Sequence, residues 1–144
     1  MSRQFKVFLS SSFQDMHEER DYLKYHAFAA LQAELFQKGW DLQILDLRGT
    51  TTQPDLSQEE AVLRLCLDGV EECVPRMVVL LGDRYGWIPY GEGAQYPDEE
   101  AKYRVETSVQ NINDTPNLDI TSDEISGRSV THLEIYYGLK HMPH

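Results

Sequence analysis

The sequence predicts an α/β fold in which helices cover both faces of a central parallel sheet. Aliphatic-rich runs of strand length alternate with longer segments of helical periodicity, in the order strand, helix, strand, helix, strand. These runs are apolar on both faces, as expected of strands that are covered on each side. Strands separated by helices pair in parallel. The chain of 144 residues suits a single domain, residues 1–144, with its own core.

The first strand is predicted at residues 4–9. Asp15 and Glu18 have the spacing of a capping box, so a helix is expected to begin there. A cation followed by a glycine, Lys38 and Gly39, is expected to end this helix. Its apolar stripe consists of Leu23, Ala27, Ala30, Leu31 and Leu35.

The next elements follow the same alternation. Residues 40–47 form the second predicted strand. Ser57 and Glu60 have capping-box spacing and introduce a helix over residues 61–73. The third strand, residues 77–82, has four consecutive aliphatic residues after its methionine, so it is expected to be the most deeply buried strand.

The cysteines fall within the second predicted helix. Cys66 and Cys73 are seven residues apart and are expected to share a buried face with Val62, Leu65 and Val70. Buried thiols at this spacing predict packing rather than a disulfide or a metal site. A reduced, cytoplasmic compartment is therefore expected.

The last third of the chain has weaker signals. Residues 92–126 are polar and acidic, with a candidate helix at residues 99–109 and a long excursion over residues 110–124. Helical periodicity returns at about Thr131.

Charge and missing motifs exclude several classes of function. The formal net charge is −11, and Lys and Arg form no basic run, so a nucleic-acid partner is not expected. No apolar run reaches the length of a membrane span, so no membrane association is expected either. The glycine-rich phosphate-binding motifs are missing, and a metal site at His141 and His144 is not favoured.

Parallel strands bring distant loops together. Ligands of open α/β sheets bind outside the carboxyl ends of the strands. Residues 10–15, 48–52 and 83–91 follow the three predicted strands, so they are expected to meet at one rim.

Four stretches, in order along the chain, resemble the TIR-like domains of unknown function that precede NACHT-type STAND ATPase modules, among them those of bacterial antiviral STAND-type proteins. The stretches are VFLSSSFQDMHEERDYL, LDLRG, LLGDRYGWIP and GRSVTHLEI. The resemblance covers most of the chain outside residues 92–126. It implies a flavodoxin-like/TIR-like three-layer sandwich with a central parallel sheet, in which residues 92–126 are a long acidic insertion.

Two departures from the family pattern concern the second loop and the C-terminal end. Gly49 and Thr50 stand where the family has Trp-Gly. The family also continues past the last helix into another strand. This departure leaves open that the chain is trimmed from a longer protein and that its sheet is truncated at the C-terminal end.

The resemblance also implies an activity. Catalytic TIR domains cleave the nicotinamide–ribose bond of NAD with a glutamate, and Glu134 matches that position within residues 129–134. A carboxylate beside the ribose stabilises the positive charge that develops as this bond breaks. NAD is then a candidate substrate, and no cofactor is expected. The candidate nucleotide-binding residues are Ser10, Ser11, Phe13, Arg48, Arg84, Tyr85 and Trp87.

These residues also have structural interpretations, which the sequence leaves open. Thr131 and Glu134 have capping-box spacing, so the carboxylate is either a helix cap or a ligand-facing group. Serines 10–12 either simply end a strand or contact a nucleotide. Residues 83–85 either lock their loop by a salt bridge or contact a ligand. Arg20 is either a solvated helix charge or half of a buried pair.

Two functions stay open. The first is an N-terminal effector domain of a STAND/NACHT-type signalling or defence protein that hydrolyses or binds NAD on oligomerisation. The second is a non-catalytic TIR-like module for protein interaction. In both, the expected partners are other copies of the domain, through homotypic self-association, and a downstream STAND/NACHT module.

Overall fold

The computed structural model describes residues 3–12, 14–47, 59–90, 99–116 and 118–143. Within these ranges the predicted alternation of strands and helices is confirmed. The elements are β1 (Arg3–Ser10), α1 (His17–Tyr22), the π-helical turn η1 (Leu23–Ala27), α2 (Phe28–Gln37), β2 (Trp40–Leu45), α3 (Glu59–Cys73), β3 (Met77–Val79), α4 (Glu99–Asn113), α5 (Ser122–Ile125) and α6 (Val130–Lys140).

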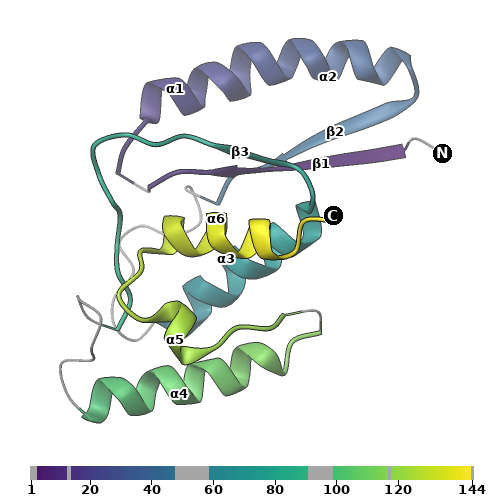
Figure 1. Cartoon of the computed structure of the whole chain (residues 1–144). Coiled ribbons are helices and arrows are strands. Elements are labelled where there is room, and N and C mark those ends of the chain that lie inside the picture. Colours follow the sequence, from purple (N-terminus) through teal and green to yellow (C-terminus); the bar gives the residue numbers. More distant parts are fainter. Residues whose placement is uncertain (1–2, 13, 48–58, 91–98, 117, 144) are drawn as a thin grey trace.

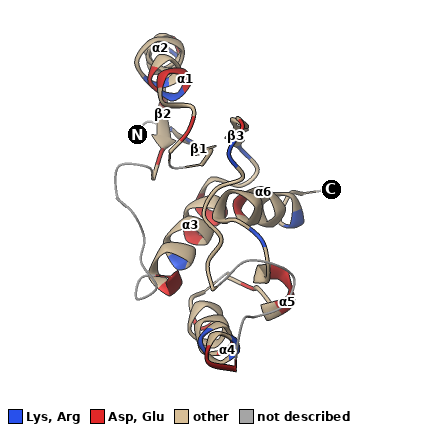
Figure 2. Cartoon of the chain, turned by 90° about the vertical axis from the view of Figure 1, so that its left-hand side faces the viewer, with Lys and Arg blue, Asp and Glu red and all other residues tan. Residues whose placement is uncertain are grey.

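The sheet is parallel, as predicted, with the strand order β2-β1-β3. Residues Phe8 to Ser10 of β1 pair with Met77 to Val79 of β3. The helical segment from α1 to α2 lies on one face of the sheet, and α3 and α6 lie on the other (Figure 1). Helices α4 and α5 lie beyond α3 and α6, which the orthogonal view also shows (Figure 2). The fold is therefore a mixed α/β sandwich, consistent with a flavodoxin-like or TIR-like arrangement.

The core extends from the sheet through the layer formed by α3 and α6 to α4 and α5. Its most deeply buried members include Phe8, Leu63, Leu67, Leu133 and Tyr137. Both cysteine thiols are free and buried, as predicted, and burial raises the pKa of Cys66 well above its ordinary value. The prediction for Leu65 is wrong, because its side chain is 41% exposed.

Gly69 allows α3 to approach the sheet closely. A Cβ atom at this position would stand 2.9 Å from the ring of Phe8 and 3.0 Å from a methyl group of Leu45. We expect Gly69→Ala to destabilise the fold by about 1–2 kcal/mol, because overpacking outweighs the better helix propensity of alanine. Urea unfolding of this variant measures the effect. A variant as stable as the native chain would contradict the close contact.

The first helical segment begins and packs differently from the prediction. Helix α1 starts at His17, and its N-cap, Met16, has a φ of 59° and no side-chain capping bond. The predicted capping box at Asp15 is therefore wrong, because the Asp15 carboxylate accepts from the amide of Met16 instead. The expected apolar stripe is not a buried face either. Helix α2 has no buried residue, and Leu31 is 41% exposed. Gly39, with a φ of 81°, follows α2 as predicted.

The third strand is shorter and more exposed than predicted. It ends at Val79, and its three residues are only half-buried. The prediction that this strand is the most deeply buried one is wrong, because β3 lies at the edge of the described sheet. The predicted capping box at Ser57 lies outside the described residues.

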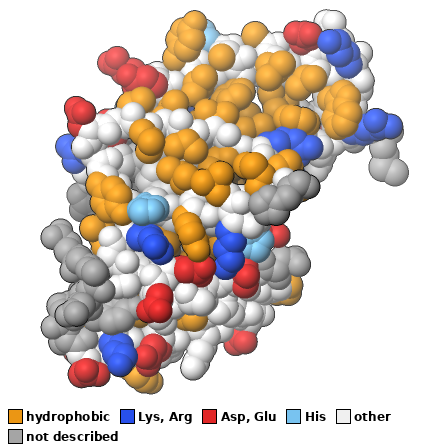
Figure 3. Space-filling model, viewed as in Figure 1, with side chains coloured by type: hydrophobic (Ala, Val, Ile, Leu, Met, Phe, Trp, Pro, Cys, Tyr) orange, Lys and Arg blue, Asp and Glu red, His pale blue; other side chains and the backbone are white. Residues whose placement is uncertain are grey.

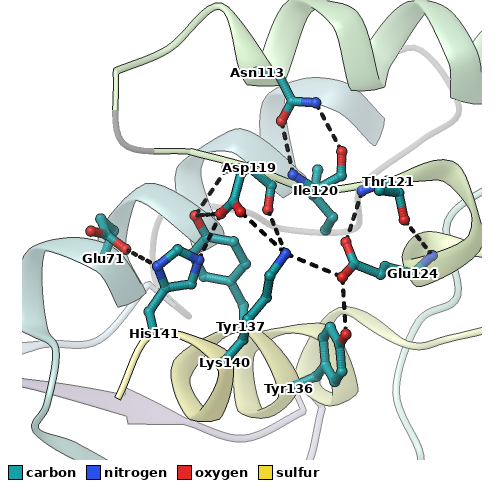
Figure 4. A network of polar contacts seen from close by, with 10 residues as sticks. All are labelled: Glu71, Asn113, Asp119, Ile120, Thr121, Glu124, Tyr136, Tyr137, Lys140 and His141. Atoms are coloured by element: carbon teal, nitrogen blue, oxygen red, sulfur yellow. Dashed lines mark hydrogen bonds and ion pairs between the residues drawn. The ribbon is translucent and has the colours of Figure 1, made fainter. Parts of the chain in front are cut away.

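The acidic stretch at residues 92–126 contains more regular structure than predicted. Helix α4 extends to Asn113, and α5 starts with a capping box formed by Thr121 and Glu124. A polar network then connects this stretch to the end of α6 (Figure 4). Its contacts include Lys140 Nζ to Glu124 Oε1 at 3.2 Å and His141 Nε2 to Asp119 Oδ1 at 2.7 Å.

Acidic side chains lie on several elements, including α1, α3, α4 and α5, rather than in one cluster (Figure 2). Among the described helices, none combines the length and the apolar character that crossing a bilayer requires.

Candidate functional site

A buried carboxyl group lies against the end of β1. Ser10 Oγ donates to Glu134 Oε1 over 3.0 Å, and the Glu134 side chain is only 4% exposed. Of the two alternatives that the sequence leaves open for Glu134, the capping box with Thr131 does not form. Ser129 is the N-cap of α6, and its hydroxyl accepts from the amide of His132 at 3.1 Å. Glu134 is therefore not committed to its own helix start and faces the sheet instead.

The environment of Glu134 favours its protonated form. Burial raises the pKa of its carboxyl group to about 8, while the hydrogen bond from Ser10 and the nearby charge of Arg20 act in the opposite direction. A buried acid with a strongly raised pKa is a frequent mark of a functional site, although structural networks produce it too.

A buried ion pair lies beside this acid. Arg20 Nη2 is 2.6 Å from Asp46 Oδ1, and both side chains are almost fully buried. Arg20 also donates to the hydroxyl of Ser11, and Lys24 Nζ lies 3.2 Å from the second Asp46 oxygen. The alternative left open by the sequence is thus decided: Arg20 is part of a buried pair. This pair connects α1 to the ends of β1 and β2.

The loops after β1 and β3 meet at the rim, as predicted from parallel pairing. Arg84 donates through its side chain to Gln14 Oε1 at 3.1 Å and through its amide to Asp15 Oδ2 at 3.4 Å. Gly86, with a φ of 99°, lies against Ser12 of the first loop. Of the predicted second loop, residues 48–52, nothing is described.

A surface pocket of about 390 Å³ opens beside these loops. Its lining includes Arg84 and Tyr85 from the loop after β3, and Thr131 and His132 from α6. The Tyr85 hydroxyl is 2.6 Å from His132 Nδ1. Partial burial and the nearby charge of Arg128 hold the pKa of His132 below its ordinary value.

The structure places the predicted site residues in two groups. Ser10, Ser11 and Glu134 form a buried group, whereas Arg84 and Tyr85 line the exposed pocket. The described lining of that pocket does not include the buried group. Trp87 packs against the hydrophobic core, and its carbonyl accepts from the amide of Val130 at 2.9 Å. Phe13 and Arg48 lie outside the described residues.

The arrangement provides two kinds of chemistry. The buried group offers a carboxyl group and two hydroxyls near the strand end, and the pocket offers a guanidinium, a phenol and an imidazole. A guanidinium suits a phosphate, and an ionised carboxylate suits a developing positive charge. Among the described residues, no set of three or more His, Cys, Asp or Glu side chains is placed to hold a metal ion. His132 was not predicted as a pocket residue, and no sequence pattern marks it.

Comparisons with known proteins match most of the chain. A family model described as a domain of unknown function, DUF4062, matches residues 6–141. Telomerase protein component 1 of Mus musculus is 34% identical over 133 residues, which is 92% of this chain, and the protein of that name from Rattus norvegicus is 33% identical over the same length. A TPR repeat-containing protein of Dictyostelium discoideum is 32% identical over 59% of the chain.

These relatives are much longer proteins. The matched region is 4% of each telomerase protein component 1 and 5% of the Dictyostelium protein. No solved structure gives a significant match.

Proposed function

The chain belongs to the DUF4062 family, and from this premise we propose that it is an N-terminal effector domain of a cytoplasmic NACHT-type signalling protein that hydrolyses NAD when copies of it assemble. The observation that carries the proposal is the Glu134 carboxyl group, which is buried at the end of β1 and accepts from Ser10 rather than capping its helix.

The proposed reaction needs an ionised carboxylate. Cleavage breaks the bond between the ribose and the nicotinamide nitrogen, and the bonding electrons leave with nicotinamide. Water adds to the ribose and loses a proton, which gives ADP-ribose. The positive charge on the ribose in the transition state is stabilised by a carboxylate but not by a neutral acid.

The isolated domain is expected to be inactive. With a pKa of about 8 and 4% exposure, Glu134 is mostly protonated at neutral pH and is shielded from substrate. Assembly that opens the end of β1 to solvent lowers this pKa toward 4.5 and admits NAD. In this scheme Arg84 holds the pyrophosphate and Tyr85 contacts a ring, since both line the adjoining pocket.

Forced clustering tests the proposal. The domain is fused to a ring-forming scaffold, and nicotinamide release from NAD is compared between clustered and monomeric forms. We expect release only from the clustered form, and Glu134→Gln is expected to lower the rate by about a hundredfold or more.

The matched control is Glu59→Gln. Glu59 is also a buried acid, 2% exposed, but it accepts from the amide of Tyr90 and pairs with Arg104 instead of facing β1. Its variant should keep the activity. A clustered domain that is folded and releases no nicotinamide would reject hydrolysis, and calorimetry with NAD and ADP-ribose would then decide whether the domain binds nucleotide without turnover.

A second candidate is a non-catalytic module for self-association, and the exposed apolar surface favours it. Hydrophobic side chains gather over α2, the edge of the sheet at β3, and α6, whereas the region around α4 and α5 is mainly polar (Figure 3). Exposed large hydrophobic side chains on or next to these elements include Leu31, Phe36, Leu81, Leu139 and Met142. Large exposed apolar patches mark interaction sites. This function predicts self-association with no thermal shift on addition of NAD.

A further inference from the structure

The end of β1 is held from two layers of the fold by buried charged side chains. Ser10 is the last residue of the strand, and its hydroxyl donates to Glu134 of α6. The hydroxyl of the next residue, Ser11, accepts from Arg20 of α1. Helices α1 and α6 lie on opposite faces of the sheet (Figure 1). Two adjacent serines therefore connect an acid from one layer to a guanidinium from the other, at the point where the strand ends.

The guanidinium of Arg20 has a donor that its contacts do not use. Nη1 donates to Ser11, and Nη2 lies 2.6 Å from Asp46 Oδ1 and 3.5 Å from the carbonyl oxygen of Leu9. Nε is buried and makes no hydrogen bond within the described part of the chain. Because a guanidinium presents several N–H groups along different edges, it can bind more than one carboxylate. Arg20 can therefore take a second acid as its partner.

Two acids feel the charge of Arg20. Asp46, just past the end of β2, forms the ion pair with it, and both side chains are almost fully buried. Burial raises the pKa of Glu134 to about 8, and, besides the hydrogen bond from Ser10, the charge of Arg20 lowers this pKa while that of Asp46 raises it. Like charges repel strongly where water is excluded, so the guanidinium favours one ionised acid at a time.

The neighbouring titratable groups do not change this balance. Lys24 Nζ lies 3.2 Å from the second oxygen of Asp46, so it helps to keep Asp46 ionised. Cys66 of α3 faces Glu134 from the other side, and burial raises the pKa of its thiol well above the ordinary value, as the charge of Glu134 also does. The thiol is therefore neutral when Glu134 changes its charge.

We propose that Asp46 and Glu134 compete for Arg20, and that this competition decides whether Glu134 is neutral or ionised. While Arg20 is paired with Asp46, Glu134 keeps its proton. When α1 moves away from the end of β2 and the pair breaks, Glu134 releases its proton to solvent and takes the place of Asp46 beside Arg20. Asp46 is then a positioning residue that keeps the isolated domain inactive. This role rests on the hydrolysis proposed above, whereas the exchange of partners is measured without NAD.

A double-mutant cycle between the two acids tests the competition. At neutral pH, Glu134→Gln alone should not lower the free energy of unfolding, because glutamine resembles the protonated acid. Asp46→Asn alone should lower it only moderately, because Glu134 ionises and replaces the lost partner. The two changes together leave Arg20 buried without a carboxylate, so the loss should be about twice the sum of the single losses or more.

The matched control is Asp46→Asn with Glu59→Gln. Glu59 is also a buried acid, but it pairs with Arg104 instead of Arg20. The losses of stability from these two changes should therefore add.

NMR of the side-chain carboxyl carbons measures the protonation of Glu134 directly, and its signal is the one that Glu134→Gln lacks. In the native chain the midpoint of the titration should be about 8. In Asp46→Asn it should fall by about one pH unit or more, because Arg20 then acts on Glu134 without a competing carboxylate. In the double variant Arg20→Met with Asp46→Leu, which lacks the guanidinium, the midpoint should be no lower than in the native chain.

Three outcomes would overturn the inference: additive losses for the two acids, a Glu134 midpoint that Asp46→Asn leaves unchanged, or a midpoint that falls equally without Arg20. An Asp46→Asn chain that is unfolded at neutral pH would also count against it, since Glu134 would then have failed to replace Asp46. None of these measurements needs NAD. Nicotinamide release from the clustered domain therefore stands or fails separately from the exchange of partners.

Discussion

Replacing Arg20 with methionine is expected to destabilise the fold by about 3–5 kcal/mol, because it takes the arginine away from a buried carboxylate. Arg20 is 2% exposed and lies 2.6 Å from Asp46, whose side chain is 4% exposed. The variant removes the ion pair and the contact with Ser11 while keeping most of the apolar stem of the side chain. Lys24 stays near Asp46 but is partly exposed, so it compensates only in part. Urea unfolding gives the loss of stability.

The double variant Arg20→Met with Asp46→Leu tests whether the ion pair behaves as a buried pair or as a surface pair. Removing both charges is expected to restore most of the stability, because two apolar side chains replace a desolvated pair. Lys38 Nζ and Glu34 Oε1 form an exposed pair at 2.9 Å, and removing one partner, as in Lys38→Met, should cost at most about 1 kcal/mol. If Arg20→Met cost no more than Lys38→Met, the pair would not be buried in solution.

Local patterns predicted the order of elements and the parallel sheet well, because each run was long enough to carry its own periodicity. Helix starts were predicted less well. Asp15 and Thr131 both have capping-box spacing, yet Asp15 contacts the amides of Met16 and Arg84, and Ser129 caps α6 instead. Capping motifs compete with tertiary contacts for the same side chains. Spacing alone does not decide which contact forms.

The candidate site was predicted only in part, and the reason differs from that for the helix starts. Parallel pairing correctly brought the loops after β1 and β3 together, and this follows from topology alone. The contact between Ser10 and Glu134 joins residues 124 positions apart, and the resemblance to a family named both residues without placing them in contact. The edge position of β3 was missed because an apolar run indicates burial but not how many neighbours a strand has.

The stability of the folded chain is expected to decrease as the pH rises toward 8, and Glu134→Gln should remove this dependence. Burial raises the pKa of Glu134 from 4.5 to about 8, so between these values the folded state holds a proton that the unfolded state has released. Raising the pH therefore favours unfolding, by about 1.4 kcal/mol for each pH unit. The stabilisation is complete below pH 4.5 and is lost as the pH rises through 8.

Glutamine resembles the protonated acid in shape and can accept from Ser10, but it does not titrate. Urea unfolding from about pH 5 to about pH 8 should therefore show a difference between Glu134→Gln and the native chain that grows to a few kcal/mol in favour of the variant. Glu124→Gln is the matched control. Desolvation raises the pKa of Glu124, but the hydrogen bonds from Thr121 and Tyr136 and the contact with Lys140 have a larger effect and lower this pKa overall. The replacement of Glu124 therefore changes the pH dependence of stability only at acidic pH. If the free energies of unfolding of Glu134→Gln and the native chain changed in parallel with pH, the carboxyl group would be ionised and solvated in the folded domain. The reason why the isolated domain is expected to be inactive would then be removed as well.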